Sequence, residues 1–170
     1  MKKIFFSIMI GFLFVSSGFG QKFAFVDTEY ILDRIPTYKV ALEQIDKLSE
    51  DYQKEIESMI AEVEKLYRNF QNERVLLTED QKLKKEEEIV AKENSVKELQ
   101  RKYFGPEGAV FQKRQELVKP IQDEVYKAVK EVAIEGAYAV IFDAASGAGI
   151  LYENPRYNIS DQILQKMGYK

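Results

Sequence analysis

Residues 38–70 read YKVALEQIDKLSEDYQKEIESMIAEVEKLYRNF, and apolar side chains recur in them at alternating steps of four and three residues. The repeat consists of ten positions: Tyr38, Leu42, Ile45, Ser49, Tyr52, Ile56, Met59, Val63, Leu66 and Phe70. All but Ser49 are apolar, and Leu48 lies beside it, whereas the residues between are mostly Glu, Lys, Asp and Gln. Such a sustained 3.5-residue repeat is typical of a long helix with one apolar stripe, hereafter the seam, that requires a partner helix.

The partner helix is expected to come from the same chain. Residues 37–104 contain neither Gly nor Pro, a stretch far longer than an ordinary globular helix. Within it, Thr78 is followed three residues later by Gln81, with two acidic residues between, which fits a capping box at a helix start. We therefore predict a hairpin with its tip near residues 76–80, and Thr37 as the N-cap of the first helix. The alternative is a single unbroken rod.

The returning segment is less regular in sequence. Its main apolar residues are Leu83, Ile89, Val90, Val96, Leu99, Tyr103 and Phe104. We expect them to drift around the helix instead of holding one stripe. Residues 105–108 read GPEG and should break the helix. A helical pattern then resumes, with apolar residues at Phe111, Val118, Ile121, Val125, Ala128 and Val132. Pro120 should kink this helix, and Gly136 should end it.

Both ends of the chain after residue 21 are β-prone. Residues 22–26 alternate and predict a short strand, followed by a brief helix over 29–34 capped by Asp27 or Thr28. Residues 137–142 predict a strand buried on both faces, which should pair as a hairpin with residues 150–152. Asn158 or Ser160 should cap a last helix. These ends provide a core of about sixty residues, which is marginal alone and favours oligomerisation, since the chain has no Cys to staple it.

Composition limits the possible functions. Residues 1–20 have a basic start, an apolar run and a small-residue end, typical of a cleavable secretory signal; a retained anchor is the alternative. Without Lys2 and Lys3, 23 basic residues face 28 acidic ones, a net charge of −5, which gives no reason to expect nucleic acid. The chain has no His and no Cys, which excludes most metal sites, Cys nucleophiles and Ser–His relays. We predict no enzyme activity, no cofactor and no metal, and no catalytic residue is nominated.

The sequence resembles the Skp family, the OmpH-like periplasmic chaperones, over nearly all of residues 21–170. The similarity is carried by the signal, Phe23-Ala24-Phe25-Val26-Asp27, Ile31-Leu32, Pro36, the charged helical hairpin, residues 135–143 (EGAYAVIFD), Leu151-Tyr152 and residues 158–164 (NISDQIL). The resemblance implies a mainly α chain with a small β body, in which a long antiparallel coiled-coil hairpin arm projects from a trimeric β-rich body. It also implies a periplasmic, ATP-independent holding chaperone for unfolded outer-membrane β-barrel proteins, which it binds in a cavity between the arms of a homotrimer.

The resemblance further implies roles for parts of the chain. The body would comprise residues 21–36 and 133–170, and the helical arm residues 37–132. Trimer and body contacts would be made by Phe23, Phe25, Val26, Val140, Phe142 and Leu151; the alternative is that these are core residues within one subunit. Client contacts would be made by Tyr52, Met59, Tyr67 and Phe70; the alternative is that Tyr52, Met59 and Phe70 pack against the return helix.

Charge separates this chain from familiar members of that family, whose arms are strongly basic. Residues 38–104 carry 13 Lys and Arg against 16 Asp and Glu, a net charge of −3. We therefore expect client binding to depend mainly on apolar contacts and confinement. Whether the tip, with Leu76 and Leu77, contacts a membrane is left open. The competing function is an exported coiled-coil spacer or stalk without a client, which the heptads support equally but which does not need the β segments.

Overall fold

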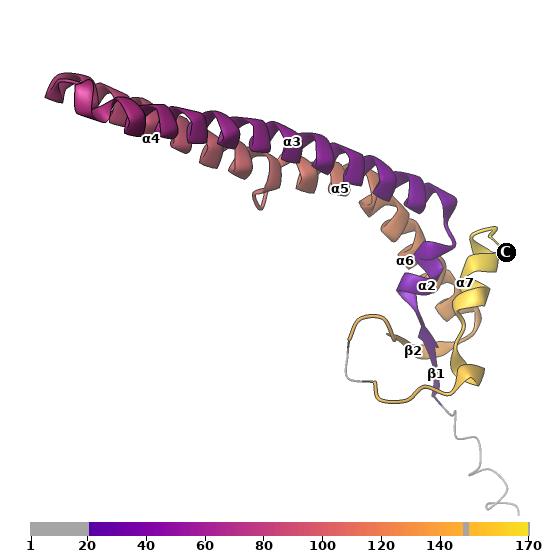
Figure 1. Ribbon diagram of the computed structural model, residues 1–170. Coiled ribbons are helices and arrows are strands. Elements are labelled where there is room, and N and C mark those ends of the chain that lie inside the picture. The colour runs from indigo at the N-terminus through magenta and orange to yellow at the C-terminus, as the bar shows by residue number, and fades with distance from the viewer. Residues whose placement is uncertain (1–20, 148–149, 170) are drawn as a thin grey trace, which may run out of the picture. The chain divides into compact units, whose positions relative to one another are not determined.

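The computed structural model describes residues 21–147 and 150–169, which fall into two units (Figure 1). The arm unit is Leu32–Tyr126; the body unit consists of the described residues up to Ile31 and from Lys127 onward. The predicted signal at residues 1–20 lies outside the described residues. The predicted fold class, mainly α with a long helical hairpin and a small β part, is confirmed.

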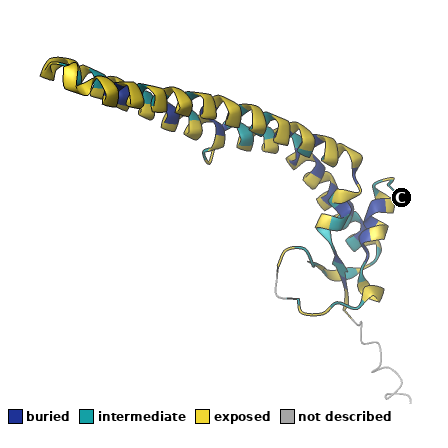
Figure 2. Ribbon diagram, viewed as in Figure 1, coloured by how far each residue is buried: buried dark blue, intermediate teal, exposed yellow. Residues whose placement is uncertain are grey.

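The outbound helix of the arm is α3, Pro36–Glu73, which is roughly 57 Å long at 1.5 Å per residue. All ten predicted seam positions are buried or half-buried, so the seam is confirmed (Figure 2). The predicted cap at Thr37 is wrong, because Ile35 occupies the N-cap position and Pro36 opens the helix. Proline fits the first helical position since its fixed φ suits a helix and its missing N–H would have no partner there.

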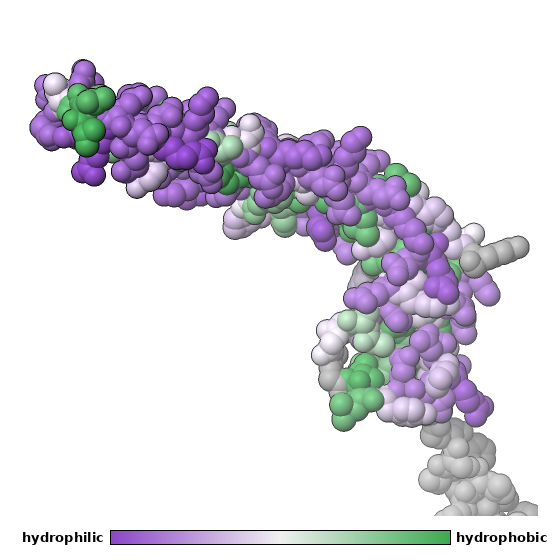
Figure 3. Space-filling model, in the orientation of Figure 1, coloured by the Kyte–Doolittle hydropathy of each residue, from purple (hydrophilic) through white to green (hydrophobic). Residues whose placement is uncertain are grey.

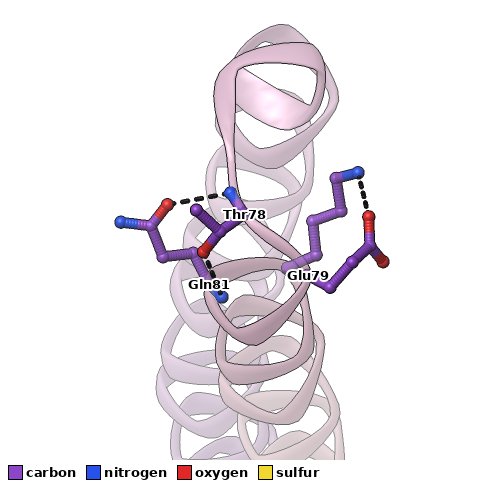
Figure 4. A network of polar contacts seen from close by, with 4 residues as sticks. Thr78, Glu79 and Gln81 are labelled. Atoms are coloured by element: carbon purple, nitrogen blue, oxygen red, sulfur yellow. Dashed lines mark hydrogen bonds and ion pairs between the residues drawn. The ribbon is translucent and has the colours of Figure 1, made fainter.

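The hairpin turn forms where the capping box predicted it. After α3 comes the 3-10 turn η1, Arg74–Leu76, and then α4, Glu79–Phe104. The Thr78 hydroxyl accepts a hydrogen bond from the Gln81 backbone N–H at 3.4 Å, and the Thr78 N–H donates to the Gln81 side chain at 3.0 Å (Figure 4). The unbroken rod is therefore excluded.

The returning helix holds a regular stripe, contrary to expectation. Its buried residues are Ile89, Val96 and Tyr103, seven residues apart. Half-buried residues fill the same stripe between and before them: Lys82, Lys85, Lys92 and Leu99. The apolar residues Leu83, Val90 and Phe104 do leave this stripe, as predicted. The continuous stripe was missed because only apolar residues were counted, whereas lysine can cover a seam with its aliphatic stem and keep its ammonium in water.

The chain from residue 105 to 135 contains a loop and two helices. Gly105 to Gly108 separates α4 from α5, Ala109–Leu117, as predicted, and a Cβ on Gly105 would collide with the Arg101 carbonyl. The kink expected at Pro120 is present as a one-residue break: α5 ends at Leu117 and α6 spans Lys119–Glu135. Val118 between them keeps helical backbone angles, and its N–H donates to the Arg114 carbonyl at 2.9 Å. The predicted apolar stripe is buried at Val118, Ile121, Val125, Ala128 and Val132, whereas Phe111 is exposed.

The body unit contains a two-stranded parallel sheet. Strand β1, Lys22–Val26, pairs with β2, Tyr138–Asp143, and Phe23 is in register with Val140. The predicted hairpin of residues 137–142 with 150–152 is therefore wrong, and residues 150–152 form no strand. Burial on both faces is also wrong for β2 in the single chain, where Ala139, Val140 and Phe142 are exposed.

Polar contacts tie three distant segments of the body together. Asp27 caps α2, Thr28–Asp33, by accepting from the Tyr30 N–H, which confirms one of the two predicted caps. The Asp143 carboxylate accepts from the Thr28 hydroxyl at 2.8 Å and from the Thr28 N–H at 3.2 Å. On the other side of β1, the Ile159 N–H donates to the Phe25 carbonyl at 2.9 Å.

The last helix is fastened to the same strand. Ser160 opens α7, Ser160–Lys166, and its hydroxyl accepts from the Asp27 N–H at 2.9 Å. The predicted cap by Asn158 or Ser160 is wrong, because Ile159 occupies the N-cap position and makes no side-chain cap bond. The Asn158 side chain instead accepts from the N–H of Ser160, the first helical residue, at 3.0 Å. The 3-10 turn η2, Pro155–Tyr157, precedes it. Strand β1 thus has partners on both edges, whereas the outer edge of β2 has no strand beside it among the described residues.

Candidate functional site

One face of the small sheet is apolar and open to solvent. We call it the body face: Phe23, Phe25, Val140, Phe142 and Tyr157. The Phe23 ring stacks on Tyr157 at a centroid distance of 5.2 Å, and Phe25 lies 5.6 Å from Phe142. Four of the five, all but Phe25, remain 45–48% exposed, and Figure 3 shows hydrophobic side chains at the surface of the body. An aromatic cluster this open in one chain is a candidate contact surface.

The six predicted body contacts therefore occupy three different environments. Phe23, Phe25, Val140 and Phe142 lie together on the body face. Val26 is buried, at 3% exposure. Leu151 is fully exposed, and Tyr152 beside it is 77% exposed. Whether any of the six contacts another copy stays a prediction.

Three of the four predicted client-binding residues pack against other side chains of the arm. Phe70 is buried at 4% exposure, and Met59 packs against the cluster of Ile56, Val96 and Tyr103. The Tyr52 ring stacks flat on Tyr103, with centroids 3.7 Å apart. The fourth, Tyr67, is 53% exposed and free to meet a ligand. Client contact by any of the four stays untested.

The Tyr103 hydroxyl donates a 2.7 Å hydrogen bond to Glu55, which spans the two helices. That bond raises the pKa of Tyr103 above its ordinary value, because the neutral phenol is the donor. A second link between the helices is the ion pair of Lys92 with Glu62 at 2.8 Å, which lowers the pKa of Glu62. These contacts fix the register of α3 against α4.

One exposed row of apolar residues on the arm was not predicted from the sequence. Beside the seam lie Ile60, Tyr67, Leu83, Val90 and Phe104, between 37% and 58% exposed, which we call the arm row. Each directly follows a seam position of its own helix, at 59, 66, 82, 89 and 103. This offset was the available signal, but it could be recognised only once the lysines of α4 were assigned to the seam.

The tip of the hairpin is also apolar. Val75 and Leu76 are 88% and 83% exposed, whereas Leu77 is half-buried, and Figure 3 shows a green patch at this end of the hairpin. Among residues 21–147 and 150–169, no helix has the length and apolar character needed to cross a bilayer. The same residues contain no group of three or more side chains suited to holding a metal ion.

A helical hairpin arm joined to a small parallel β body defines a recognisable class of fold. A model of the OmpH-like outer membrane protein family matches residues 22–167, and the chain belongs to this family. Among solved structures, one similar fold is a protein from Caulobacter crescentus CB15 assigned as an OmpH-like outer membrane chaperone. It has a TM-score of 0.63 and 11% sequence identity, over 86% of this chain and 83% of that one. Among curated proteins, none is similar enough to the sequence to match.

Proposed function

We propose that this protein is an ATP-independent periplasmic holding chaperone that binds unfolded outer-membrane β-barrel proteins and keeps them from aggregating. Membership of the OmpH-like family supports a chaperone role in general, and the fold shared with the Caulobacter protein agrees with it. The observation that carries the proposal is the amount of large apolar surface left open along the arm and body, which a stalk would not need. Export would depend on the sequence pattern of residues 1–20.

The assembled form in this proposal is a homotrimer whose body faces are covered by other copies. Support comes from the body unit, which has two strands, an open β2 edge and an exposed aromatic cluster. A two-stranded sheet is marginal on its own, and an unpaired edge invites another strand. Three arms would then enclose the space in which a client is held, without nucleotide or metal.

Two measurements test the proposal together. Analytical ultracentrifugation of the mature chain should give the mass of a trimer. The purified protein should also keep a urea-diluted outer-membrane β-barrel protein soluble, in a complex that survives size-exclusion chromatography. A monomer, or a trimer that leaves the client to aggregate, would contradict the proposal, and the second result would favour a coiled-coil spacer.

A further inference from the structure

We propose that the arm row is a docking surface for unfolded segments in which Lys or Arg lies next to apolar side chains. This inference rests on the proposed holding function and adds which segments the arm prefers. It goes beyond apolar holding because it assigns a charge preference to one flank of the hairpin. The preference follows from the carboxylates that border the arm row.

The residues of the arm row lie on the same flank of the hairpin. Positions that directly follow the two seam positions of a heptad, e and b, project to one side of a helix, and these sides adjoin in an antiparallel pair. The contacts agree with this geometry. Phe104 of α4 lines one shallow groove with five residues of α3: Ser49, Glu50, Gln53, Lys54 and Glu57. The two helices therefore share this flank as one surface.

Carboxylates border the arm row on both helices. On α3, Glu43, Glu50, Glu57 and Glu64 recur every seven residues, and Glu50 and Glu57 line the groove that holds Phe104. On α4, Glu86 and Glu93 occupy the position next to the seam on the same flank. Glu64 pairs with Arg68 at 3.7 Å; within the described part of the chain, the other five form no ion pair. Lys54, the one basic residue lining the groove, lies 4.0 Å from Asp51.

The opposite flank differs in this respect. There, Glu62 is paired with Lys92 at 2.8 Å, and Glu55 accepts the Tyr103 hydroxyl. These two acids thus hold the hairpin together, whereas five of the six glutamates beside the arm row form no ion pair within the described part of the chain. Lys97, which directly follows the seam position Val96, is a cation on the arm-row flank of α4, and the six glutamates outnumber it. A ligand carrying positive charge would therefore meet a net negative surface on this flank.

Charge and apolar contact would contribute differently to binding. Exposed ion pairs are worth about 0–1 kcal/mol each, so most affinity would come from burying apolar side chains against the arm row. The carboxylates would instead discriminate, by attracting basic segments and repelling acidic ones. The Phe104 ring adds a face on which a Lys or Arg side chain can lie.

Three labelled peptides of one length and one set of apolar residues test this, with Lys, Ser or Asp at the variable positions. Fluorescence anisotropy with the full mature protein should show the Lys peptide binding about tenfold more tightly than the Asp peptide at low salt. This ratio should shrink toward one in about 0.5 M salt, where the Debye length falls to a few ångströms. The Ser peptide should be almost insensitive to salt.

Matched variants locate the preference. Glu50→Gln with Glu57→Gln should reduce the Lys-to-Asp ratio at least threefold and leave the Ser peptide unchanged. Glu87→Gln with Glu98→Gln removes the same charge from other exposed positions of α4 and should leave the ratio unaltered. Phe104→Ala should weaken all three peptides, and the Lys peptide most, because it removes both apolar surface and the ring face for the cation.

The results that would overturn this inference differ from those that would overturn the proposed holding function. Loss of the preference in both double variants, or no preference in the parent protein, would overturn this inference while client holding persists. If the arm row were covered by a second copy, Glu50→Gln with Glu57→Gln would change the mass of the protein instead, which would also overturn it. If neither peptides nor an unfolded β-barrel protein bind at all, the proposed function itself fails.

Discussion

The arm and the body differ in how far each completes its own core. In the arm, α3 finds its partner in α4, and the cluster of Ile56, Val96 and Tyr103 is buried within one chain. In the body, β1 and β2 leave Phe23, Val140 and Phe142 about half exposed. The arm therefore buries its seam and leaves the arm row and the tip open, whereas the body buries residues such as Ile163 and leaves a whole face of its sheet open. Mutations should therefore destabilise the fold of the arm but weaken association at the body.

The largest effect is expected from truncating a buried side chain in the core of the arm. Ile56 is 2% exposed, and Ile56→Ala should lower the free energy of unfolding by about 2–5 kcal/mol, the usual cost of deleting a buried aliphatic chain. The measurement is denaturant unfolding followed by helical circular dichroism at one protein concentration, since assembly would shift the midpoint.

Ile60 provides the matched control, four residues along the same helix. It is 37% exposed, so Ile60→Ala should cost about 1 kcal/mol or less. Equal losses for the two variants would mean that the arm row is as buried as the seam in the native assembly, so that the arm would not complete its core within one chain.

The arm was predictable because its contacts are local and periodic. A strict repeat from Tyr38 to Phe70 fixed the seam, and Thr78 with Gln81 fixed the turn. The prediction failed for the lysines of α4, whose position on the seam shows only against the partner helix. The start of α3 at Pro36 was missed because a capping side chain was expected where none is used.

Mutation of the body face should affect association of the subunits more than the fold of one subunit. Phe142 is 45% exposed in one chain, so Phe142→Ala should barely alter the fold of a subunit. If the body face is buried between copies, the same change should raise the concentration at which the assembly dissociates by about tenfold or more, about 1.4 kcal/mol. Sedimentation across a dilution series measures this.

Tyr126→Ala is the control for that experiment, because Tyr126 is 72% exposed and belongs to the arm unit. It should leave the dissociation midpoint unchanged. A parent protein that stays monomeric at all concentrations, or a Phe142 variant as stable in assembly as the parent, would mean that the body face has no such role.

Sequence reasoning did less well on the body because its contacts span the whole chain. Both strands were located, but the partner of β2 was sought nearby, in residues 150–152, instead of in β1 more than a hundred residues away. Parallel pairing needs a long crossover, which the entire arm supplies here. The bonds of Asp143 with Thr28 and of Ser160 with Asp27 link segments that no local pattern connects.

The turn of the arm offers a smaller effect. Thr78→Ala removes the hydroxyl that accepts from the Gln81 N–H and should cost about 1 kcal/mol, within the 0.5–2 range for N-cap loss. Hydrogen exchange should become faster in the first turn of α4 and remain unchanged near Tyr103. Thr78→Ser keeps the acceptor and should restore protection; if it exchanges as fast as the alanine variant, the cap is not what holds the tip.

The smallest effect concerns the ion pair between the two helices of the arm. The hydrogen bond and charge of Lys92 lower the pKa of Glu62 below that of an ordinary glutamate, so the folded state favours the charged carboxylate. The stabilisation is therefore present above the unfolded pKa and is lost as the pH falls through the folded one. The melting temperatures of the parent and Glu62→Gln should differ slightly at pH 7 and converge as the pH is lowered below about 4.

Lys47→Gln, which removes an exposed cation of α3 that forms no ion pair among the described residues, should show no such convergence. A difference between the parent and Glu62→Gln that persists in acid would mean that Glu62 stabilises the hairpin by packing instead of by charge.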